Sequence, residues 1–309
     1  MKRKTLSIVS PVYNEEGNID KFYSTLKKVL NELDYDHEII FINDGSKDKS
    51  LLNLSKLAVE DKSVKVISFA RNFGHQMAIT AGIDHATGDA CIILDSDLQD
   101  PPAVIKDLVK KWEKGFEIVN AKRASRSDGF FKDTSAVIFY KVLNSLLTNK
   151  IPENVGDFRL IDKKPLKVLQ SIKEKDRYLR GLTTWVGFKQ TEVLYDRAKR
   201  EWGKTGYSMS KMFGLALNAI FSFSRLPMKI ASIFCGIFFV ILIGVLIYVL
   251  ISVLTGFSAA GWASQILIYS IYFGIQMLVL AIISEYVGRI YFQVQNRPLY
   301  VIQDKINLD

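Results

Sequence analysis

Short apolar runs alternate with longer amphipathic segments through the first 125 residues of the chain. Apolar runs that end in turn residues predict buried strands, and apolar positions spaced three and four apart predict helices. The alternation of the two predicts a mostly parallel sheet with helices on both faces, an α/β fold. The predicted strands cover residues 6–12, 38–43, 64–69, 90–94 and 117–121, and the predicted helices cover residues 19–33, 49–61, 76–86 and 103–114.

The pattern changes after residue 125. Residues 130–147 have the spacing of an amphipathic helix, and short strands are predicted at 158–161 and 192–195. Residues 208–224 place apolar side chains on one helical face beside basic residues, which is typical of a helix lying on a membrane surface. Packing of this helix against the globular domain explains the same pattern, and the two interpretations are compatible.

No charged residue occurs from Ile230 to Ser284. Two stretches within it, residues 230–254 and 262–283, are long enough to cross a bilayer, and a short glycine-containing turn joins them. We therefore predict a transmembrane hairpin, the alternative being a buried helical hairpin in a large soluble core. The expected organisation is a catalytic domain at 1–203, an interfacial region at 204–229, the two spans within 230–284, and a tail at 285–309.

Charge gives this hairpin an orientation. The net charge is +9, and the excess lies in residues 1–229, most densely just before the first uncharged stretch. Lysine and arginine flank the pair of spans and are missing from the turn between them, which predicts that both flanks are cytoplasmic. The protein is thus expected in the inner (plasma) membrane as a multi-pass protein with both termini cytoplasmic. Nucleic-acid binding is not expected, because the basic residues concentrate beside the spans.

Candidate chemistry begins where the predicted strand 90–94 ends. Asp95 and Asp97 are one residue apart, and Gln99 follows them. The carboxyl ends of strands are where open α/β sheets bind ligands, and paired oxygen donors suit a hard divalent cation that also contacts a diphosphate. A solvated loop is the simpler interpretation of this spacing alone, so the position after a buried strand is what favours a metal site.

Three other predicted strands also end in polar residues. Pro11, Tyr13 and Glu15 follow the first strand, Asp44 follows the second, and Arg71 follows the third. Pro11 and Tyr13 suit the stacking of a base, and Asp44 suits hydrogen bonds to a base or ribose. Carboxylates in the first turn of a helix and Asn-Asp-Gly-Ser in a turn have ordinary structural explanations too. The convergence of these loops on one sheet edge is what indicates a nucleotide site.

Four segments together resemble the motifs of family 2 glycosyltransferases, in the order of that family. They are Pro11–Glu15, Asn43–Ser46, Asp95–Pro101 and Gly156–Leu160. The chain is most similar to the polyprenyl-phosphate glycosyltransferases, which include dolichyl-phosphate mannose synthase, and among them to bacterial bactoprenol glucosyltransferases with two C-terminal spans. Residues 154–160 and 285–291, with Arg297 and Pro298, support that subgroup, and the resemblance covers essentially the whole chain.

The resemblance implies a GT-A fold and roles for particular residues. It implies a divalent cation, Mg²⁺ or Mn²⁺, held by Asp95, Asp97 and Gln99, and an inverting reaction with Asp157 as the catalytic carboxylate. The expected site comprises catalytic Asp157 and Arg200; nucleotide-binding Pro11, Tyr13, Glu15, Asp44, Arg71 and Asp95; and phosphate-binding or acceptor-binding Arg123, Arg126, Arg159, Lys204 and Tyr207. The family's Arg-x-x-Gly-x-Ser/Thr-Lys-Tyr loop has Gly206 in place of lysine here, and Asn43 stands where many members have aspartate.

Three roles are compatible with Asp157. The carboxylate is conventionally a general base. However, a phosphate monoester has a second pKa of about 6 and is mostly dianionic near neutral pH, so little proton removal is needed. Asp157 is then expected to orient the acceptor or to pair with an arginine. A salt bridge to Arg159 that only fixes the loop is the structural alternative.

We predict transfer of one sugar from a UDP-sugar to undecaprenyl phosphate at the cytoplasmic face of the membrane. UDP-glucose is the first candidate donor, UDP-N-acetylglucosamine the second, and a 4-amino-4-deoxyarabinose donor the third. Expected partners are the lipid bilayer, a flippase, and further copies of the chain in a homo-oligomer such as a tetramer. A non-catalytic scaffold that binds nucleotide-sugar is the alternative, and a processive synthase is disfavoured because the Gln-x-x-Arg-Trp motif is missing.

Overall fold

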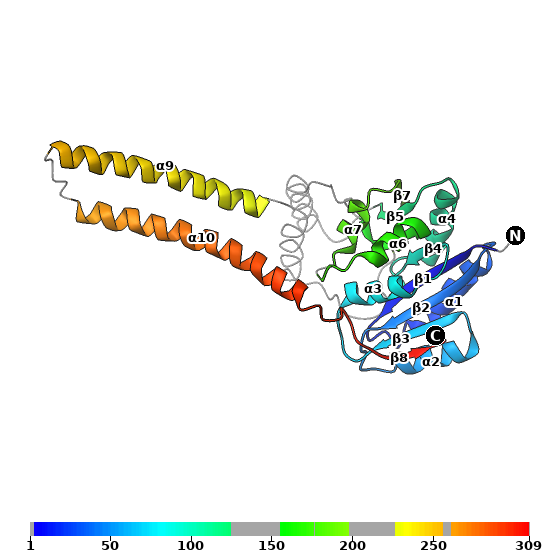
Figure 1. Ribbon diagram of the computed structural model, residues 1–309. Helices are drawn as coiled ribbons and strands as arrows, with labels where there is room; N and C mark the ends of the chain where they lie inside the picture. The colour runs from blue at the N-terminus through cyan, green and yellow to red at the C-terminus, as the bar shows by residue number, and fades with distance from the viewer. Residues whose placement is uncertain (1–2, 125–154, 176, 198–225, 256–260, 309) are drawn as a thin grey trace. The chain divides into compact units, whose positions relative to one another are not determined.

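A computed structural model describes residues 3–124, 155–175, 177–197, 226–255 and 261–308. Contacts divide the chain into two compact units. The first holds the sheet and includes Arg297–Asp309, and the second holds two long helices within Phe213–Asn296. The two units are described separately (Figure 1).

Eight strands form the sheet of the first unit, in the order β7-β5-β6-β4-β1-β2-β3-β8. Strand β1 pairs in parallel with β2 and β4, β2 with β3, and β5 with β7. Strand β6 is antiparallel to β4 and β5, and β8 is antiparallel to β3. The bounds are β1 Thr5–Val12, β2 Asp36–Asn43, β3 Val64–Phe69, β4 Ala90–Ile93, β5 Ile118–Arg123, β6 Val155–Asp162, β7 Gln190–Tyr195 and β8 Ile302–Ile306.

Helices cover both faces of this sheet. On one face, the core joins strand residues such as Ile8 and Phe41 to Phe22 and Leu26 of α1, together with residues of α2 and α4. On the other face α3 lies so close to β1 and β2 that a Cβ on Gly82 would meet Val9 Cγ1 at 2.1 Å. The helices are α1 Ile19–Asn31, α2 Ser50–Glu60, α3 His75–His85, the 3-10 helix η1 Pro102–Val104, α4 Ile105–Glu113, α6 Lys163–Ser171 and α7 Leu179–Trp185.

Burial on both faces explains why the central strands are mostly apolar and show no regular alternation of apolar and polar residues. The predicted α/β class and the mostly parallel sheet are confirmed. Within the described residues of the first unit, each predicted strand and helix matches an observed one to within a few residues at its ends. Strand β8 and helices α6 and α7 were not predicted. The expected helix at 130–147 and the expected interfacial helix at 208–224 lie outside the described residues.

The second unit contains α9 Leu226–Thr255 and α10 Trp262–Val294, which contact each other. Both expected apolar segments are therefore helical, and α10 continues past the predicted end of the second span. Among the described residues, Ile271–Val294 within α10 is long and apolar enough to cross a membrane by length and composition.

Candidate active site

The site lies where β1, β2 and β4 end. The parallel register pairs Val12 with Asn43 and Val9 with Ile93, so the loops that follow these strands meet at one edge of the sheet. This edge is where open α/β sheets place their ligands. The predicted convergence of the strand-end loops is therefore present in the structure.

The first two of these loops are joined by hydrogen bonds. The backbone N–H of Asn14 donates to Ser46 Oγ at 3.0 Å, and Asn14 Oδ1 accepts from the backbone N–H of Lys47 at 2.8 Å. The backbone N–H of Glu15 donates to Ser50 Oγ at 3.0 Å. Asn14 has a φ of +54°, which asparagine tolerates better than most residues. The two loops thus form one rigid surface.

Asp44 joins the third loop to this surface. Its Oδ1 accepts from the backbone N–H of Phe73 at 2.7 Å, and its Oδ2 accepts from that of Gly74 at 3.0 Å. Burial raises the pKa of Asp44, and these hydrogen bonds oppose the rise. Gly45 beside it has a φ of +64°, and a Cβ there would lie 2.5 Å from the carbonyl carbon of Arg71. The third loop therefore packs against a position that only glycine fits.

The Asp95–Gln99 turn follows β4. Asp97 Oδ1 accepts from the backbone N–H of Gln99 at 3.1 Å, and Leu98 between them has a φ of +59°. Asp95 Oδ1 is buried and makes no hydrogen bond, and it forms an ion pair with His75 Nε2 at 3.7 Å. Burial raises the pKa of Asp95 to about 6; the charge of His75 opposes the rise, and the nearby carboxylates of Asp157, Asp100 and Asp97 add to it.

These donors fit a divalent cation. A buried carboxylate oxygen without a hydrogen bond is costly unless a cation or another donor satisfies it. Carboxylate and amide oxygens are the donors that Mg²⁺ and Mn²⁺ prefer. Within the described residues, no group of three or more His, Cys, Asp or Glu side chains is arranged to hold a metal ion by itself. The protein donors therefore suit a cation that takes further ligands from a second molecule.

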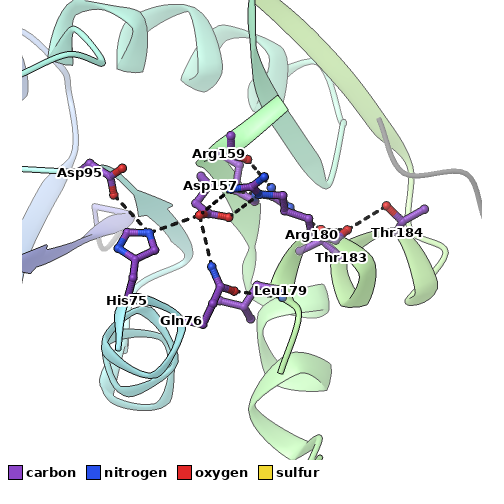
Figure 2. Close-up of polar contacts among 10 residues, drawn as sticks. His75, Gln76, Asp95, Asp157, Arg159, Leu179, Arg180, Thr183 and Thr184 are labelled. Atoms are coloured by element: carbon purple, nitrogen blue, oxygen red, sulfur yellow. Dashed lines mark hydrogen bonds and ion pairs between the residues drawn. The ribbon is translucent and has the colours of Figure 1, made fainter. Parts of the chain in front are cut away.

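Asp157 is the centre of the polar network in Figure 2. It lies on β6 and is 7% exposed. Arg180 of α7 donates to both carboxylate oxygens, Nε to Oδ1 at 2.9 Å and one terminal nitrogen to Oδ2 at 3.1 Å. Oδ2 also lies 3.3 Å from Gln76 Nε2 and 3.3 Å from His75 Nε2. Asp157 therefore pairs with Arg180, not with Arg159 as the structural alternative assumed.

The pKa values of two groups in the network, Asp157 and His75, are shifted. Burial would raise the pKa of Asp157, but the charge and hydrogen bonds of Arg180 and His75 hold it well below its usual range. Burial would lower the pKa of His75, but the charges of Asp95 and Asp157 raise it to about 9. At neutral pH a protonated His75 lies between two carboxylates. Such an arrangement disperses charge at the sheet edge and makes Asp157 a weak base.

The other expected nucleotide-binding residues lie around the same edge. Pro11 is buried and its carbonyl accepts from Ser96 Oγ at 3.0 Å, while Tyr13 is 44% exposed. Glu15 is buried, with Oε2 accepting from Asn18 Nδ2 at 2.5 Å. Arg71 is exposed, and its guanidinium lies 4.2 Å from the centre of the Phe73 ring. Nucleotide binding by these residues stays a prediction.

Two of the expected phosphate-binding arginines are held by protein groups. Arg159 is 2% exposed and donates to the carbonyl of Gly156 at 2.7 Å and to Thr183 Oγ1, and burial lowers its pKa to about 10. Arg123 donates to the Tyr195 hydroxyl at 3.4 Å. Their phosphate-binding roles stay predictions. Four further expected residues lie outside the described residues: Arg126, Arg200, Lys204 and Tyr207.

Sequence reasoning missed His75, Gln76 and Arg180. His75 and Gln76 begin the helix that follows a strand-end loop, and this position is the signal that could have found them. Arg180 lies in a region without a clear pattern, on the short helix α7. Its pairing with Asp157 is a contact between residues 23 positions apart, and no local signal indicates it.

Comparison with known proteins extends these observations. The model of "Glycosyl transferase family 2" matches residues 7–169. The glycosyltransferase YkcC of Bacillus subtilis is 43% identical over 306 residues, covering 98% of this chain and 94% of that protein. A bactoprenol glucosyl transferase of Shigella flexneri, derived from prophage SfII, is 42% identical over 305 residues, covering 96% and 97%.

Among solved structures, the similarity is weaker. Glucosyl-3-phosphoglycerate synthase of Mycobacterium tuberculosis, in complex with Mn²⁺, UDP-glucose and phosphoglyceric acid, is 16% identical with a TM-score of 0.47, covering 70% of this chain and 77% of that one. Residues 1–349 of TarS from S. aureus, in complex with UDP-GlcNAc, are also 16% identical with a TM-score of 0.47, covering 70% and 65%.

Proposed function

This chain belongs to glycosyl transferase family 2, and from that premise we propose that it transfers glucose from UDP-glucose to undecaprenyl phosphate. The observation that carries the proposal is the similarity to bactoprenol glucosyl transferases over nearly the whole chain. The match to the Shigella flexneri protein covers 96% of this chain and therefore extends beyond the sheet into the long helices. A lipid acceptor fits a chain that has a long apolar helix.

The site residues support a nucleotide-sugar donor. The interlocked loops after β1 and β2 carry Tyr13, which is 44% exposed, and the buried Asp44, and these residues suit a nucleoside. Asp95, Asp97 and Gln99 would hold Mg²⁺ or Mn²⁺, and such a cation stabilises the negative charge that develops on a departing diphosphate. Arg71 stands exposed at the end of β3 and is available to a phosphate.

In the proposed reaction, an oxygen of the acceptor phosphate attacks the anomeric carbon of glucose. The bond from that carbon to the β-phosphate oxygen breaks, UDP leaves with the electron pair, and the configuration inverts to give a β-linked lipid phosphate. A dianionic phosphate has no proton to lose, so Asp157 acts through its position and charge. Asp157, held by Arg180, would orient the groups that bind the acceptor.

We also propose that α9 and α10 form a membrane hairpin. The first unit, which holds the sheet and is called the catalytic unit from here on, would lie in the cytoplasm with both termini. Both helices exceed the length needed for a bilayer, and residues 230–284 carry no charge. Basic residues flank the pair and are missing from the turn. This arrangement would keep the catalytic unit near the headgroup of a lipid acceptor.

Incubation of the purified full chain with radiolabelled UDP-sugars, Mg²⁺ and undecaprenyl phosphate tests the proposal. Label from UDP-glucose should enter the lipid fraction, and label from UDP-N-acetylglucosamine should enter it much more slowly. The absence of labelled lipid with every donor would contradict the reaction, and preference for a different donor would correct the sugar. Nucleotide binding without turnover would favour a scaffold.

A further inference from the structure

The C-terminal segment, residues 297–309, forms part of the catalytic unit. Its strand β8 pairs with β3 along the outer edge of the sheet. Next to the paired residues, the backbone N–H of Ala70 donates to the carbonyl of Val301 at 3.0 Å. This bond lies at the point where β3 ends and the Arg71–Gly74 loop begins.

Tyr300 of this segment contacts the stretch from the end of β3 to the end of α3 at both of its ends. Its ring stacks on Phe69, the last residue of β3, with centroids 5.1 Å apart and an interplanar angle of 18°. Its hydroxyl donates to Asp84 Oδ2 at 3.0 Å, near the last residue of α3. A single side chain thus connects the start of the loop to the far end of the helix that follows it.

The segment between these two contacts carries candidate site residues. Phe69 packs edge-on against Phe73, with ring centroids 5.6 Å apart, and Arg71 lies over the Phe73 ring. The backbone N–H of Phe73 donates to Asp44. Helix α3 begins with His75 and Gln76, which reach Asp157. The position of this segment therefore affects both the expected nucleoside pocket and the Asp157 network.

We infer that Tyr300 is a positioning residue for donor binding, acting through Phe69 and Asp84 on the Arg71–Gly74 loop and on α3. The inference rests on the proposed function, because the loop is assigned to the nucleotide through it. Tyr300 itself touches no candidate ligand-binding side chain among the described contacts. Loss of its ring removes the stacked face of Phe69, and loss of its hydroxyl removes a partner of Asp84. Either change frees the loop and the helix to shift.

Two variants of the full chain in detergent separate these contacts. Tyr300→Phe keeps the stacked ring and removes the hydrogen bond to Asp84, whereas Tyr300→Leu keeps apolar bulk and removes both. Because a small misplacement of binding groups costs up to about 100-fold, we expect Tyr300→Leu to raise the KM for UDP-glucose about tenfold. Tyr300→Phe should raise it about threefold, since only one contact is lost.

The matched control is Val301→Ala. The Val301 side chain is 46% exposed, and its backbone carbonyl, which holds Ala70, is retained in the variant. The KM for UDP-glucose should stay at the wild-type value in this control. The KM for undecaprenyl phosphate should also stay at the wild-type value in this control, because neither the loop nor α3 loses a contact.

A second measurement does not depend on turnover. Calorimetric titration of UDP in the presence of Mn²⁺ should show a Kd that rises in the same order as the KM for UDP-glucose. If wild type binds UDP but makes no glycolipid, the proposed function fails while a weaker Kd in Tyr300→Leu still supports the inference.

If Tyr300 had a purely structural role, the variants would have lower melting temperatures. At temperatures where the variants are folded, their KM for the donor and their Kd for UDP would be unchanged. That result would overturn the inference, as would a wild-type chain that binds no UDP. Should Tyr300→Leu fail to fold, the donor KM of Tyr300→Phe decides, and an unchanged value overturns the inference.

Discussion

Arg180 and Asp157 face each other with two hydrogen bonds, one to each carboxylate oxygen, at 2.9 and 3.1 Å. The paired geometry fixes the plane of the Asp157 carboxylate as well as its charge. A carboxylate held in this way has a low pKa and accepts a proton poorly. This geometry supports the proposed orienting role of Asp157 over that of a base, and the chemistry of the proposed acceptor phosphate supports the same choice.

Replacement of Arg180 should reduce kcat more than it changes the KM for the donor. In Arg180→Lys the positive charge is kept but the two-point contact is lost, and Arg180→Gln leaves a buried carboxylate without its main partner. We expect kcat to fall about tenfold in the first and about 100-fold or more in the second. Arg3→Gln, which removes an arginine from an exposed pair with Asp34, is the control and should leave kcat unchanged. Steady-state kinetics at saturating donor checks this, and equal kcat values would remove Arg180 from the site.

Asp97→Asn should remove nearly all turnover while the fold is kept. The side chain keeps its size and an oxygen, but it loses the charge that a divalent cation needs. We expect the melting temperature to stay near that of wild type, and kcat to fall about 1,000-fold. Asp107→Asn on α4 changes the charge of an exposed aspartate, and it is the matched control. Unchanged glycolipid synthesis in Asp97→Asn would rule out a role for Asp97 in holding the cation.

Gly45→Ala should disturb the donor site, whereas Gly115→Ala should not. Both glycines have positive φ, +64° and +86°, so alanine brings backbone strain of about 1–2 kcal/mol at either position. Only at Gly45 would the new Cβ also meet backbone, 2.5 Å from Arg71. The comparison of melting temperature and UDP affinity in the two variants separates strain from collision. Similar UDP affinities would show that the close approach of the loops does not matter for binding.

Acid should remove the contribution of Asp61 to stability. Burial would raise the pKa of Asp61, but hydrogen bonds from Lys27, Ser63 and Tyr23 hold it well below its usual range. A carboxyl whose pKa is lowered by folding stabilises the protein above the unfolded pKa of about 4, and this contribution is lost as the pH falls toward the folded pKa.

The variant Asp61→Asn tests the direction of this pH dependence. At pH 7 the free energy of unfolding should fall by about 2 kcal/mol, because a charged partner of Lys27 is removed. The difference between wild type and variant should shrink steadily below about pH 4. Thermal melts across this range provide the measurement. A difference that is constant with pH would contradict the assigned pKa shift.

The sheet was predictable because its strands carry a strong local signal. β1, β2, β3 and β4 are almost entirely buried, so apolar residues predominate in each without a regular polar alternation, and the strand-end loops carry their polar residues in short motifs. Strand β8 could not be predicted in the same way. Its sequence, Ile302–Ile306, contains three polar residues with exposed side chains, and the strand is placed by its pairing with β3, more than 230 residues earlier.

The residues of the candidate site also fall into those that the sequence predicts and those that it does not. Asp95, Asp97, Asp44 and Asp157 follow or lie in strands and are recognised by local sequence. Arg180 and Tyr300 act through contacts with distant segments, Arg180 with β6 and Tyr300 with β3 and α3. Such contacts depend on how whole helices and strands pack, so they cannot be predicted from the spacing of residues along the chain.

The position of β8 in the chain has a consequence for biosynthesis. The ribosome makes β8 after α9 and α10, although β8 belongs to the same sheet as strands made long before those helices. Early strands of a nascent domain can pair as they emerge, but this sheet acquires its last strand only when the apolar helices have been translated. The catalytic unit can therefore be completed only after the helices have been synthesised. An enzyme with its full sheet arises only from a chain that already contains its apolar segments.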